Sequence, residues 1–302
     1  MGLEEAMSTT TIWCPYSGNY LNHEACSPEH IIPLSLGGSN AFTVMVSSEL
    51  NAKAGSEIDA ALATKDLGTM IRRREFSARG HSKQQPEVRI RTATYGTDQR
   101  PAQVTLRGQD GLTVWDAKER REIPEKELSG RPIHLRFLIK PYDRIRFVAK
   151  VALAAGYAIY GDLFRVTANH NDLRALMQAG SIRSAKKVLT SSNLRGCFDL
   201  YPIEKKDVHE TRLQKKMCET VEGSVVITIP TTTGVLFTVG VLGHWVGTLN
   251  VPAVTDSYPI DEAHDLGQVT LLIAKQMEKI SYRDFAKRML EELTHQAPFA
   301  SD

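Results

Sequence analysis

The stretch EHIIPLSLGG at residues 29–38 decides how the N-terminal part of this chain folds. It opens with a carboxylate beside an imidazole, continues as a short apolar run, and ends in two glycines, which predicts a short strand that runs into a loop. Glu29 and His30 are neighbours, so they face opposite sides of an extended strand. Both could serve one site only if the strand bends, and Pro28 and Pro33 flank the pair closely enough to favour a bend.

The residues that follow predict a second strand and a helix. AFTVMVS at 41–47 is β-branched and apolar, which is typical of a strand. Ser47 or Ser48 predicts a helix that starts near Leu50, because a hydroxyl can satisfy a free backbone N–H at a helix start. In NAKAGSEIDAAL at 51–62, apolar residues recur at helical spacing, so one helix face should be apolar. We therefore expect strand, loop, strand and helix in close succession.

The composition is that of a folded protein. The chain has 302 residues, of which 42% are hydrophobic, enough for one large or two ordinary domains. No window approaches the roughly 18 uninterrupted apolar residues of a membrane span, and the N-terminus lacks the basic run and apolar stretch of a secretory signal. We expect a cytoplasmic protein with no membrane partner, and reduced cysteines because the four show no paired spacing.

Charge gives a local rather than a global signal. The formal net charge is only +2, with 37 basic against 35 acidic residues, so bulk charge does not indicate a nucleic-acid partner. Residues 71–91, however, are strongly basic. Two interpretations stay open there, a solvated linker face and a strip that contacts phosphates. The candidates for phosphate contact are Arg72, Arg73, Arg74 and Arg79.

The remaining sequence predicts further strands and helices. A helix is expected over 142–160, with Gly161 past its end, and two or three strands over 224–251. A final helix is expected after Ser281, which with Asp284 forms a capping box. In that helix Phe285, Met289 and Leu293 recur at i, i+4 and i+8, so they should share one face. Antiparallel strands are expected from alternating polar and apolar residues in EVRIRTATYG (87–96), AQVTLRG (102–108), LTVWDA (112–117) and PIHLRFLIK (132–140).

At the N-terminal residues the chain resembles the HNH nuclease family, a branch of the His-Me finger or ββα-metal nucleases. The branch reads roughly C-x-x-C, then E-H-I-I-P-x-x-L-G-G, then C-x-x-C-N-x-x-x-G-S. Here these segments become CPYS at 14–17, EHIIPLSLGG at 29–38, and SSEL followed by NAKAGS at 47–56. The resemblance spans residues 12–65, and its combination of segments is far more specific than a lone EH pair.

The resemblance implies a metal-dependent endonuclease. His30 resembles the general base, since a neutral His can take a proton from water near working pH. Glu29 and Asn51 resemble the ligands of one Mg²⁺ or Mn²⁺, because a carboxylate and a neutral oxygen suit a hard ion. Asn40 resembles the middle Asn that steadies the loop, and with His30 it is a candidate catalytic residue. Lys53 is a further candidate for contact with phosphate, although a solvent-facing helical Lys is the plainer interpretation.

One part of the family pattern is missing. Where the family often has two CxxC pairs that hold a structural zinc, this chain keeps Cys14 and has Ser17, Ser47 and Leu50 at the other positions. A tetrahedral four-cysteine site is therefore not available. We expect no structural zinc, and expect apolar packing to hold the finger in its place.

These observations predict an α+β chain with three segments that have different roles. Residues 1–75 would form the HNH finger, 76–90 a basic linker, and 91–302 an α+β domain with an antiparallel sheet, for target recognition or regulation. The leading hypothesis is an endonuclease that hydrolyses DNA, in phage defence, restriction or a mobile element, with a homodimer as one option. Two alternatives stay open, namely a non-catalytic nucleic-acid-binding protein with a degenerate finger, and a cytosolic module that senses a small molecule.

Overall fold

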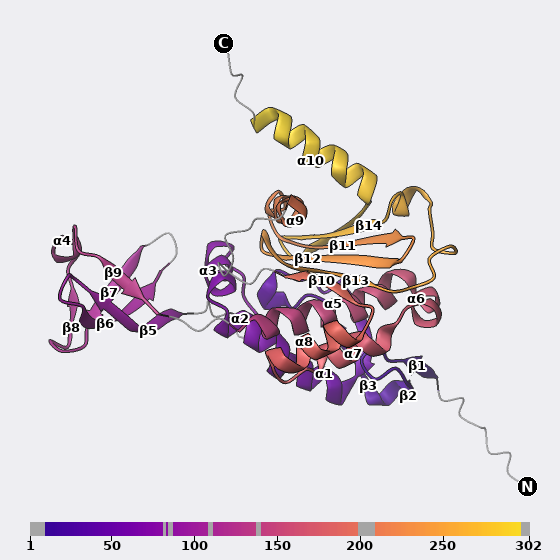
Figure 1. Ribbon diagram of the computed structural model, residues 1–302, viewed down its shortest axis with the longest axis horizontal. Coiled ribbons are helices and arrows are strands. Elements are labelled where there is room, and N and C mark those ends of the chain that lie inside the picture. The colour runs from indigo at the N-terminus through magenta and orange to yellow at the C-terminus, as the bar shows by residue number, and fades with distance from the viewer. Residues whose placement is uncertain are drawn as a thin grey trace, which may run out of the picture.

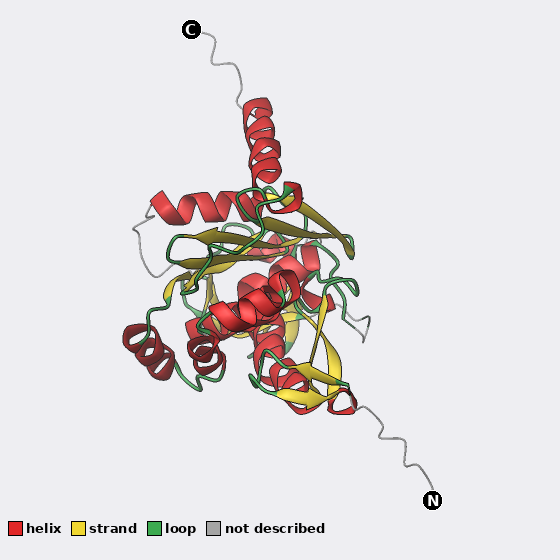
Figure 2. Ribbon diagram, turned by 90° about the vertical axis from the view of Figure 1, so that its right-hand side faces the viewer, coloured by secondary structure: helices red, strands yellow, loops and turns green. Residues whose placement is uncertain are grey.

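A computed structural model describes residues 10–80, 83, 87–107, 111–136, 140–198 and 209–296. Over these residues the chain is α+β, as expected. A six-stranded antiparallel sheet lies between two layers (Figures 1 and 2). One layer holds helices α9 (His209–Glu219) and α10 (Tyr282–Gln296), and the other holds α5 (Pro141–Tyr160) with the N-terminal elements.

The N-terminal elements form a hairpin that leads into a helix. Strands β3 (Cys26–His30) and β4 (Thr43–Ser47) pair in antiparallel register, with His30 opposite Thr43. Helix α1 (Ser48–Ala54) follows directly, and the Ser47 side chain caps it by accepting the backbone N–H of Leu50 at 3.4 Å. The predicted order of elements and the predicted cap are confirmed. We call residues 26–54 the hairpin–helix unit.

Steric constraints of the backbone explain why residues 37 and 38 are both glycine. Gly37 has a φ of 78°, in the left-handed region. A Cβ on Gly38 would lie 1.7 Å from the carbonyl oxygen of Ile32, far inside contact distance. The loop therefore turns tightly enough for the backbone N–H of Ile31 to reach the carbonyl of Phe42 at 3.1 Å. This turn places residues 31–42 across the end of β3.

The remaining N-terminal elements flank this unit. A short hairpin precedes it, and the helical segment after it continues through a π-helical turn into two further helices. In order, the flanking elements are β1 (Thr11–Trp13), β2 (Tyr20–Asn22), η1 (His23–Ala25), η3 (Gly55–Asp59), α2 (Ala60–Lys65) and α3 (Leu67–Glu75), while η2 (Leu34–Leu36) lies inside the unit, in the hairpin loop.

The C-terminal part supplies α5 and the large sheet. Helix α5 matches the predicted span, and three shorter helices follow it, namely α6 (Asp162–Thr167), α7 (His170–Met177) and α8 (Ile182–Ser191). The strand order is β10-β13-β12-β11-β14-β15. The strands are β10 (Arg195–Phe198), β11 (Ser224–Thr231), β12 (Gly234–Val241), β13 (His244–Val251), β14 (Gln268–Ile273) and β15 (Gln276–Ser281).

The predicted cap of the last helix is confirmed. The backbone N–H of Asp284 donates to the Ser281 hydroxyl at 3.1 Å, and that hydroxyl donates to the Asp284 carboxylate at 2.9 Å. Phe285 and Met289, which the spacing predicted to face inward, are buried against the large sheet. Leu293, expected on the same face, lies outside the residues whose side chains the structure describes.

A second, smaller sheet stands apart from the rest of the molecule, at the left of Figure 1. Its strand order is β8-β7-β6-β5-β9, and it has its own core, which includes Tyr95, Val104 and Val114. All four predicted strands occur here. The elements are β5 (Val88–Tyr95), β6 (Arg100–Leu106), β7 (Leu112–Asp116), β8 (Arg121–Ile123), α4 (Glu125–Leu128) and β9 (Ile133–Leu135). We call residues 88–135 the small sheet.

The core differs from the predicted division into domains. Ile31 and Val46 of the hairpin–helix unit share one hydrophobic cluster with Phe147 of α5 and Val239 of the large sheet. Residues 1–75 therefore do not form a separate domain, and 91–302 is not one domain either, because the small sheet is inserted between α3 and α5. Composition marked the boundary near 75–90, but the return of the chain to the same core depends on contacts far apart in sequence.

Within the described ranges, no helix combines the length and the apolar character that a membrane span requires.

Candidate functional site

His30 lies at the end of β3, where the hairpin loop begins. Its side chain is half-buried, and Nε2 lies 2.9 Å from Oδ1 of Asn40. With the amide oxygen facing the ring, Nε2 carries the proton and the basic lone pair belongs to Nδ1. The two candidate catalytic residues, His30 and Asn40, are thus brought together, although ten positions separate them.

Asn51 lies in α1 and faces β3. Its amide nitrogen donates to the Ser27 hydroxyl at 3.0 Å and to the Pro28 carbonyl at 3.2 Å. These bonds tie the first turns of α1 to the strand that carries His30. Its amide oxygen is the atom that would serve as a neutral metal ligand.

Glu29 lies where strand alternation places it, on the side of β3 opposite to His30, and that side is the core. Only 6% of Glu29 is exposed. Its carboxylate forms an ion pair with the ammonium of Lys150 in α5 and accepts the Tyr16 hydroxyl at 3.4 Å. The prediction that Glu29 and Asn51 hold one metal ion required a bend that turns Glu29 outward. The carboxylate instead points inward, toward Lys150.

Asp59 completes the buried charged group below β3. Its two oxygens lie 3.0 and 2.9 Å from the Lys150 ammonium, which also donates to the backbone carbonyl of His30 at 3.2 Å. Burial raises the pKa of Asp59 to about 6, although Lys150 opposes this shift. Burial lowers the pKa of Lys150, but the carboxylates of Asp59 and Glu29 outweigh burial and hold that pKa above its ordinary value. Lys150 is therefore an ammonium at neutral pH.

Sequence reasoning missed this group. Lys150 is separated from His30 by 120 positions, so no local pattern links the two. One signal was present, however. In RFVAKVALAAG, Lys150 interrupts a helix that is otherwise apolar over several turns, and a lysine at such a position is almost never fully buried without a partner.

The predicted basic strip is mostly structural. Arg73 is only 6% exposed and donates to the carbonyls of Ser35 and Ala63 at 2.7 and 2.8 Å. Arg72 donates to the carbonyl of Leu242 at 2.8 Å and pairs with Glu75. These two guanidinium groups hold α3 against the body of the molecule, by which we mean the described residues outside the small sheet. Buried Arg73 does not lie on a surface strip, which corrects that part of the expectation.

The other two arginines of the strip differ from each other. Arg74 is half-buried and donates to the carbonyl of Arg107 in the small sheet at 3.3 Å. Arg79 is exposed, so it stays a candidate for contact with phosphate.

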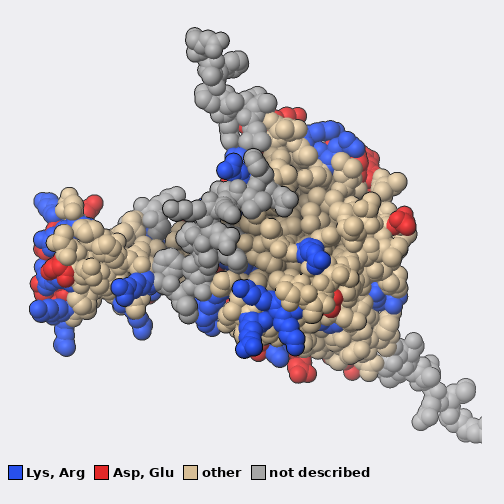
Figure 3. All heavy atoms as spheres, in the orientation of Figure 1, with Lys and Arg blue, Asp and Glu red and all other residues tan. Residues whose placement is uncertain are grey.

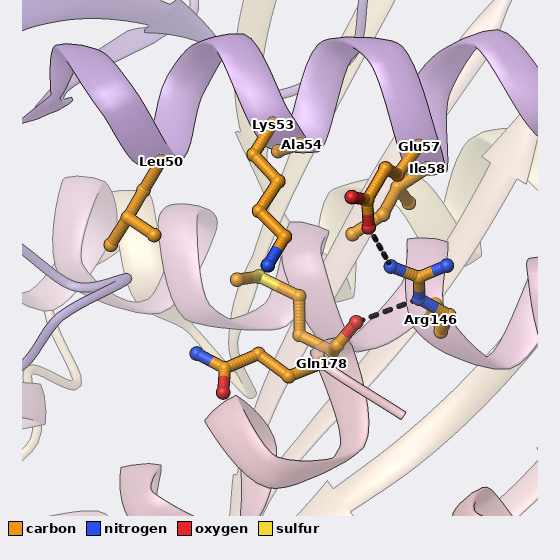
Figure 4. Close-up of a pocket in the computed structure, with 8 residues that line it drawn as sticks. Leu50, Lys53, Ala54, Glu57, Ile58, Arg146 and Gln178 are labelled. Atoms are coloured by element: carbon orange, nitrogen blue, oxygen red, sulfur yellow. Dashed lines mark hydrogen bonds and ion pairs between the residues drawn. The ribbon is translucent and has the colours of Figure 1, made fainter. Parts of the chain in front are cut away.

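Lys53 is exposed on α1 and lies beside α7 (Figure 4). It lines a cavity of about 30 Å³, enough for about one water molecule, together with Gln178 and Arg146. Arg146 donates to Glu57 at 3.0 Å and to the carbonyl of Met177 at 2.8 Å. The ammonium of Lys53 points toward the end of α7, and His30 is not among the residues that line this cavity.

The stretch SIRSAKK (181–187) carries little signal by sequence alone, but its basic side chains form a surface next to α7. Figure 3 shows basic side chains gathered where Figure 1 places α8. Arg183, Lys186 and Lys187 of this helix are exposed, and residues 178–198 contain no acidic residue. We call Arg183, Lys186 and Lys187 the α8 patch.

Two metal sites were implied by the resemblance. In place of the zinc-binding cysteines, the Cys14 thiol is buried and accepts the backbone N–H of Ser47 at 3.2 Å, which ties the end of the hairpin to residues 13–16. For the catalytic ion, the ion pair between Glu29 and Lys150 does not fit Glu29 as a ligand. Nowhere in the described part of the chain do three or more His, Cys, Asp or Glu side chains form a group that could hold a metal ion.

Comparisons with known proteins leave the family unassigned. No family model matches the chain, and neither a curated protein nor a solved structure matches it significantly.

Proposed function

We propose that this chain is an endonuclease of the HNH type that hydrolyses phosphodiester bonds in DNA. The observation that carries the proposal is the contact of 2.9 Å between His30 Nε2 and Asn40 Oδ1. It lies at the end of a β-hairpin that leads directly into a helix, which is the arrangement that the resemblance implies. The His30 imidazole is half-buried and hydrogen-bonded where the hairpin loop begins. This position suits a general base better than it suits a partner in a surface ion pair.

The pair supports a specific chemical step. Nδ1 of His30 takes a proton from water as the water oxygen attacks phosphorus. The bond from phosphorus to the leaving sugar oxygen breaks, and that oxygen keeps the electron pair and takes a proton from a solvent water molecule. The ring then carries a positive charge, and its Nε2–H bond to Asn40 becomes charge-assisted and stronger. Asn40 therefore holds the ring in one tautomer and stabilises its protonated form. The metal ion implied by the resemblance enters no step here, because Glu29 does not fit as its ligand.

The α8 patch offers a surface for the substrate. Nonspecific binding to DNA comes mainly from basic side chains that neutralise phosphates and release counterions. Three exposed cations on one helix with no acidic neighbour in sequence suit that role. They replace Arg72 and Arg73 in the proposal, since those two bind carbonyls of the chain itself.

A second function is favoured by a different observation. The carboxylate that the family would use for metal is paired with Lys150. A finger that keeps its shape but has lost metal-dependent cleavage would be a nucleic-acid-binding module. This alternative predicts binding to DNA that weakens with salt, without cleavage.

The decisive experiment compares cleavage by three proteins. Supercoiled plasmid is incubated with the wild type, His30→Ala and His23→Ala, each in Mg²⁺, in Mn²⁺ and with chelator. His23 is exposed in η1 and is the matched control. We expect nicking by the wild type and by His23→Ala, and a loss of roughly 10²- to 10⁴-fold in His30→Ala.

Two outcomes would contradict the proposal. Nicking by folded His30→Ala at the wild-type rate would remove His30 as the base. Binding to DNA with no nicking by the wild type in any condition would favour the non-catalytic module instead.

A further inference from the structure

The side chain of Lys150, which belongs to α5, extends toward the hairpin–helix unit. Its side chain is fully buried, with 0% exposed. The ammonium has three N–H donors, and its acceptors are Glu29, Asp59 and the backbone carbonyl of His30. Every donor therefore has an oxygen partner, and all three partners belong to the segment that the resemblance describes.

The geometry is that of a cation held by oxygen atoms. Two carboxylates and one carbonyl are the ligand types that Mg²⁺ or Mn²⁺ would take in a protein. A metal ion that used Glu29 at the same point would have to lie beside the ammonium, and two positive charges in a dry interior repel strongly. The ammonium and the metal ion are thus alternatives at this position.

We propose that Lys150 is the built-in cation of this site, so that Glu29 binds the ammonium and not a divalent ion. Removal of the ammonium would leave Glu29 and Asp59 as a buried carboxylate pair that takes up a divalent ion. The same ammonium fixes the backbone of His30 through its carbonyl. This inference rests on the proposed function for its meaning, but its test measures metal binding and uses no DNA.

The test uses the full chain and Mn²⁺ alone. Free Mn²⁺ is measured by electron paramagnetic resonance during titration of the wild type, Glu29→Gln, Lys150→Ala and Arg146→Ala. Arg146 is the matched control, because it is a buried cation one turn earlier on α5 that pairs with Glu57. We expect Glu29→Gln to leave the Mn²⁺ affinity of the wild type unchanged.

Lys150→Ala should gain a Mn²⁺ site. We expect its affinity to exceed that of the wild type at least tenfold, which is about 1.4 kcal/mol, and its thermal midpoint to rise with Mn²⁺ because the ion binds only the folded state. Arg146→Ala should show neither change. Addition of Glu29→Gln to Lys150→Ala should abolish the gain.

Several results would overturn the inference. A Mn²⁺ site in the wild type that Glu29→Gln weakens tenfold would show that Glu29 is already a metal ligand. Folded Lys150→Ala that gains no Mn²⁺ binding would show that Glu29 and Asp59 do not take up a divalent ion when the ammonium is removed. If Lys150→Ala fails to fold even with Mn²⁺, the comparison of the wild type with Glu29→Gln decides. An absence of cleavage would count against the proposed function only.

Discussion

Asp66 shows how much one side chain can stabilise this fold. Its carboxylate pairs with the guanidinium of Arg144 at 2.8 and 2.9 Å, and one oxygen also caps α3 by accepting the backbone N–H of Thr69 at 2.9 Å. Arg144 is 1% exposed, so the pair is largely dry. Burial alone would raise the pKa of Asp66, but Arg144 and Thr69 outweigh burial and hold that pKa below its ordinary value.

Asp66→Asn should therefore destabilise the protein in a way that depends on pH. The Asn oxygen can still cap α3, but Arg144 loses its charged partner, which costs about 3 kcal/mol of unfolding free energy at pH 7. Because the folded pKa is depressed, this stabilisation is present above the ordinary value of 3.8 and is lost as the pH falls through the folded pKa.

Urea unfolding of both proteins at pH 7 and at pH 3 tests this expectation. The difference in unfolding free energy between the wild type and Asp66→Asn should be smaller at pH 3 than at pH 7. The control is Asp162→Asn, which removes a surface partner of Arg165 and should cost less than about 1 kcal/mol. A gap for Asp66→Asn that is equal at both pH values would contradict a role for the ion pair.

The resemblance named His30 and Asn40 as candidate catalytic residues, and the structure places their side chains in contact. Alternation along β3 also predicted that Glu29 and His30 face opposite sides. It could not reveal what lies on the inner side, because Lys150 comes from a helix far along the chain. The metal role of Glu29 was inferred from the resemblance, and the contact with Lys150 does not support it.

At the scale of elements, whether a basic residue is available to bind phosphate depends on the helix face that it occupies, and not on whether it belongs to a basic run of the sequence. Arg73 belongs to the most basic stretch of the chain but points into the body. Lys186, in a less conspicuous stretch, lies on the outer face of α8. A run of charge in sequence does not show which side of a helix each residue occupies, so it could not distinguish the two.

Replacement of the α8 patch by Ala should weaken nonspecific binding to DNA. If Arg183, Lys186 and Lys187 each bind a phosphate, the slope of log affinity against log salt should fall by roughly 0.9 for each phosphate that is no longer neutralised. Fluorescence anisotropy with a labelled duplex at several salt concentrations measures that slope.

The matched control is a triple Ala variant of the exposed basic residues of α10. Those residues, Arg283, Lys287 and Arg288, all pair with acidic side chains. We expect the control to keep the wild-type slope. An unchanged slope in the α8 variant would show that Arg183, Lys186 and Lys187 contact solvent and not phosphate.

Strands and helices were predicted better than their assembly. Local alternation located the strands of the small sheet, and helical spacing located α5. Strands β14 and β15 were not predicted, although LLIAKQMEKIS at 271–281 contains the β-hairpin between them. Its turn uses Ala274 and Lys275 at positive φ, without the Gly or Asn that signals such a turn.

At the scale of the whole molecule, the small sheet and the body have separate cores. The small sheet buries a compact group around Val104 and Val114, while the body buries one large cluster around α5. The two meet near α3, where Ile71 and Leu106 line a cavity of about 380 Å³. Two parts that bury separate cores can open at different free energies.

We expect the small sheet to open independently of the body. Native-state hydrogen exchange at increasing urea should show the amides of β5, β6 and β7 exchanging as one group, at a lower opening free energy than the amides of α5 and β12. Exchange of both groups with the same opening free energy and the same dependence on urea would show a single cooperative unit instead.

The ion pair between Asp66 and Arg144 has a consequence for how this chain can vary. It joins two residues 78 positions apart, one before α3 and one in the first turns of α5, so the segment between them leaves the body and returns to the same place. Loop closure costs only about 0.6 kcal/mol more for each doubling of length. Evolution could therefore lengthen, shorten or exchange the segment between α3 and α5 while the contact of His30 with Asn40 stays intact. Under the proposed function, this junction is where a change of target would arise.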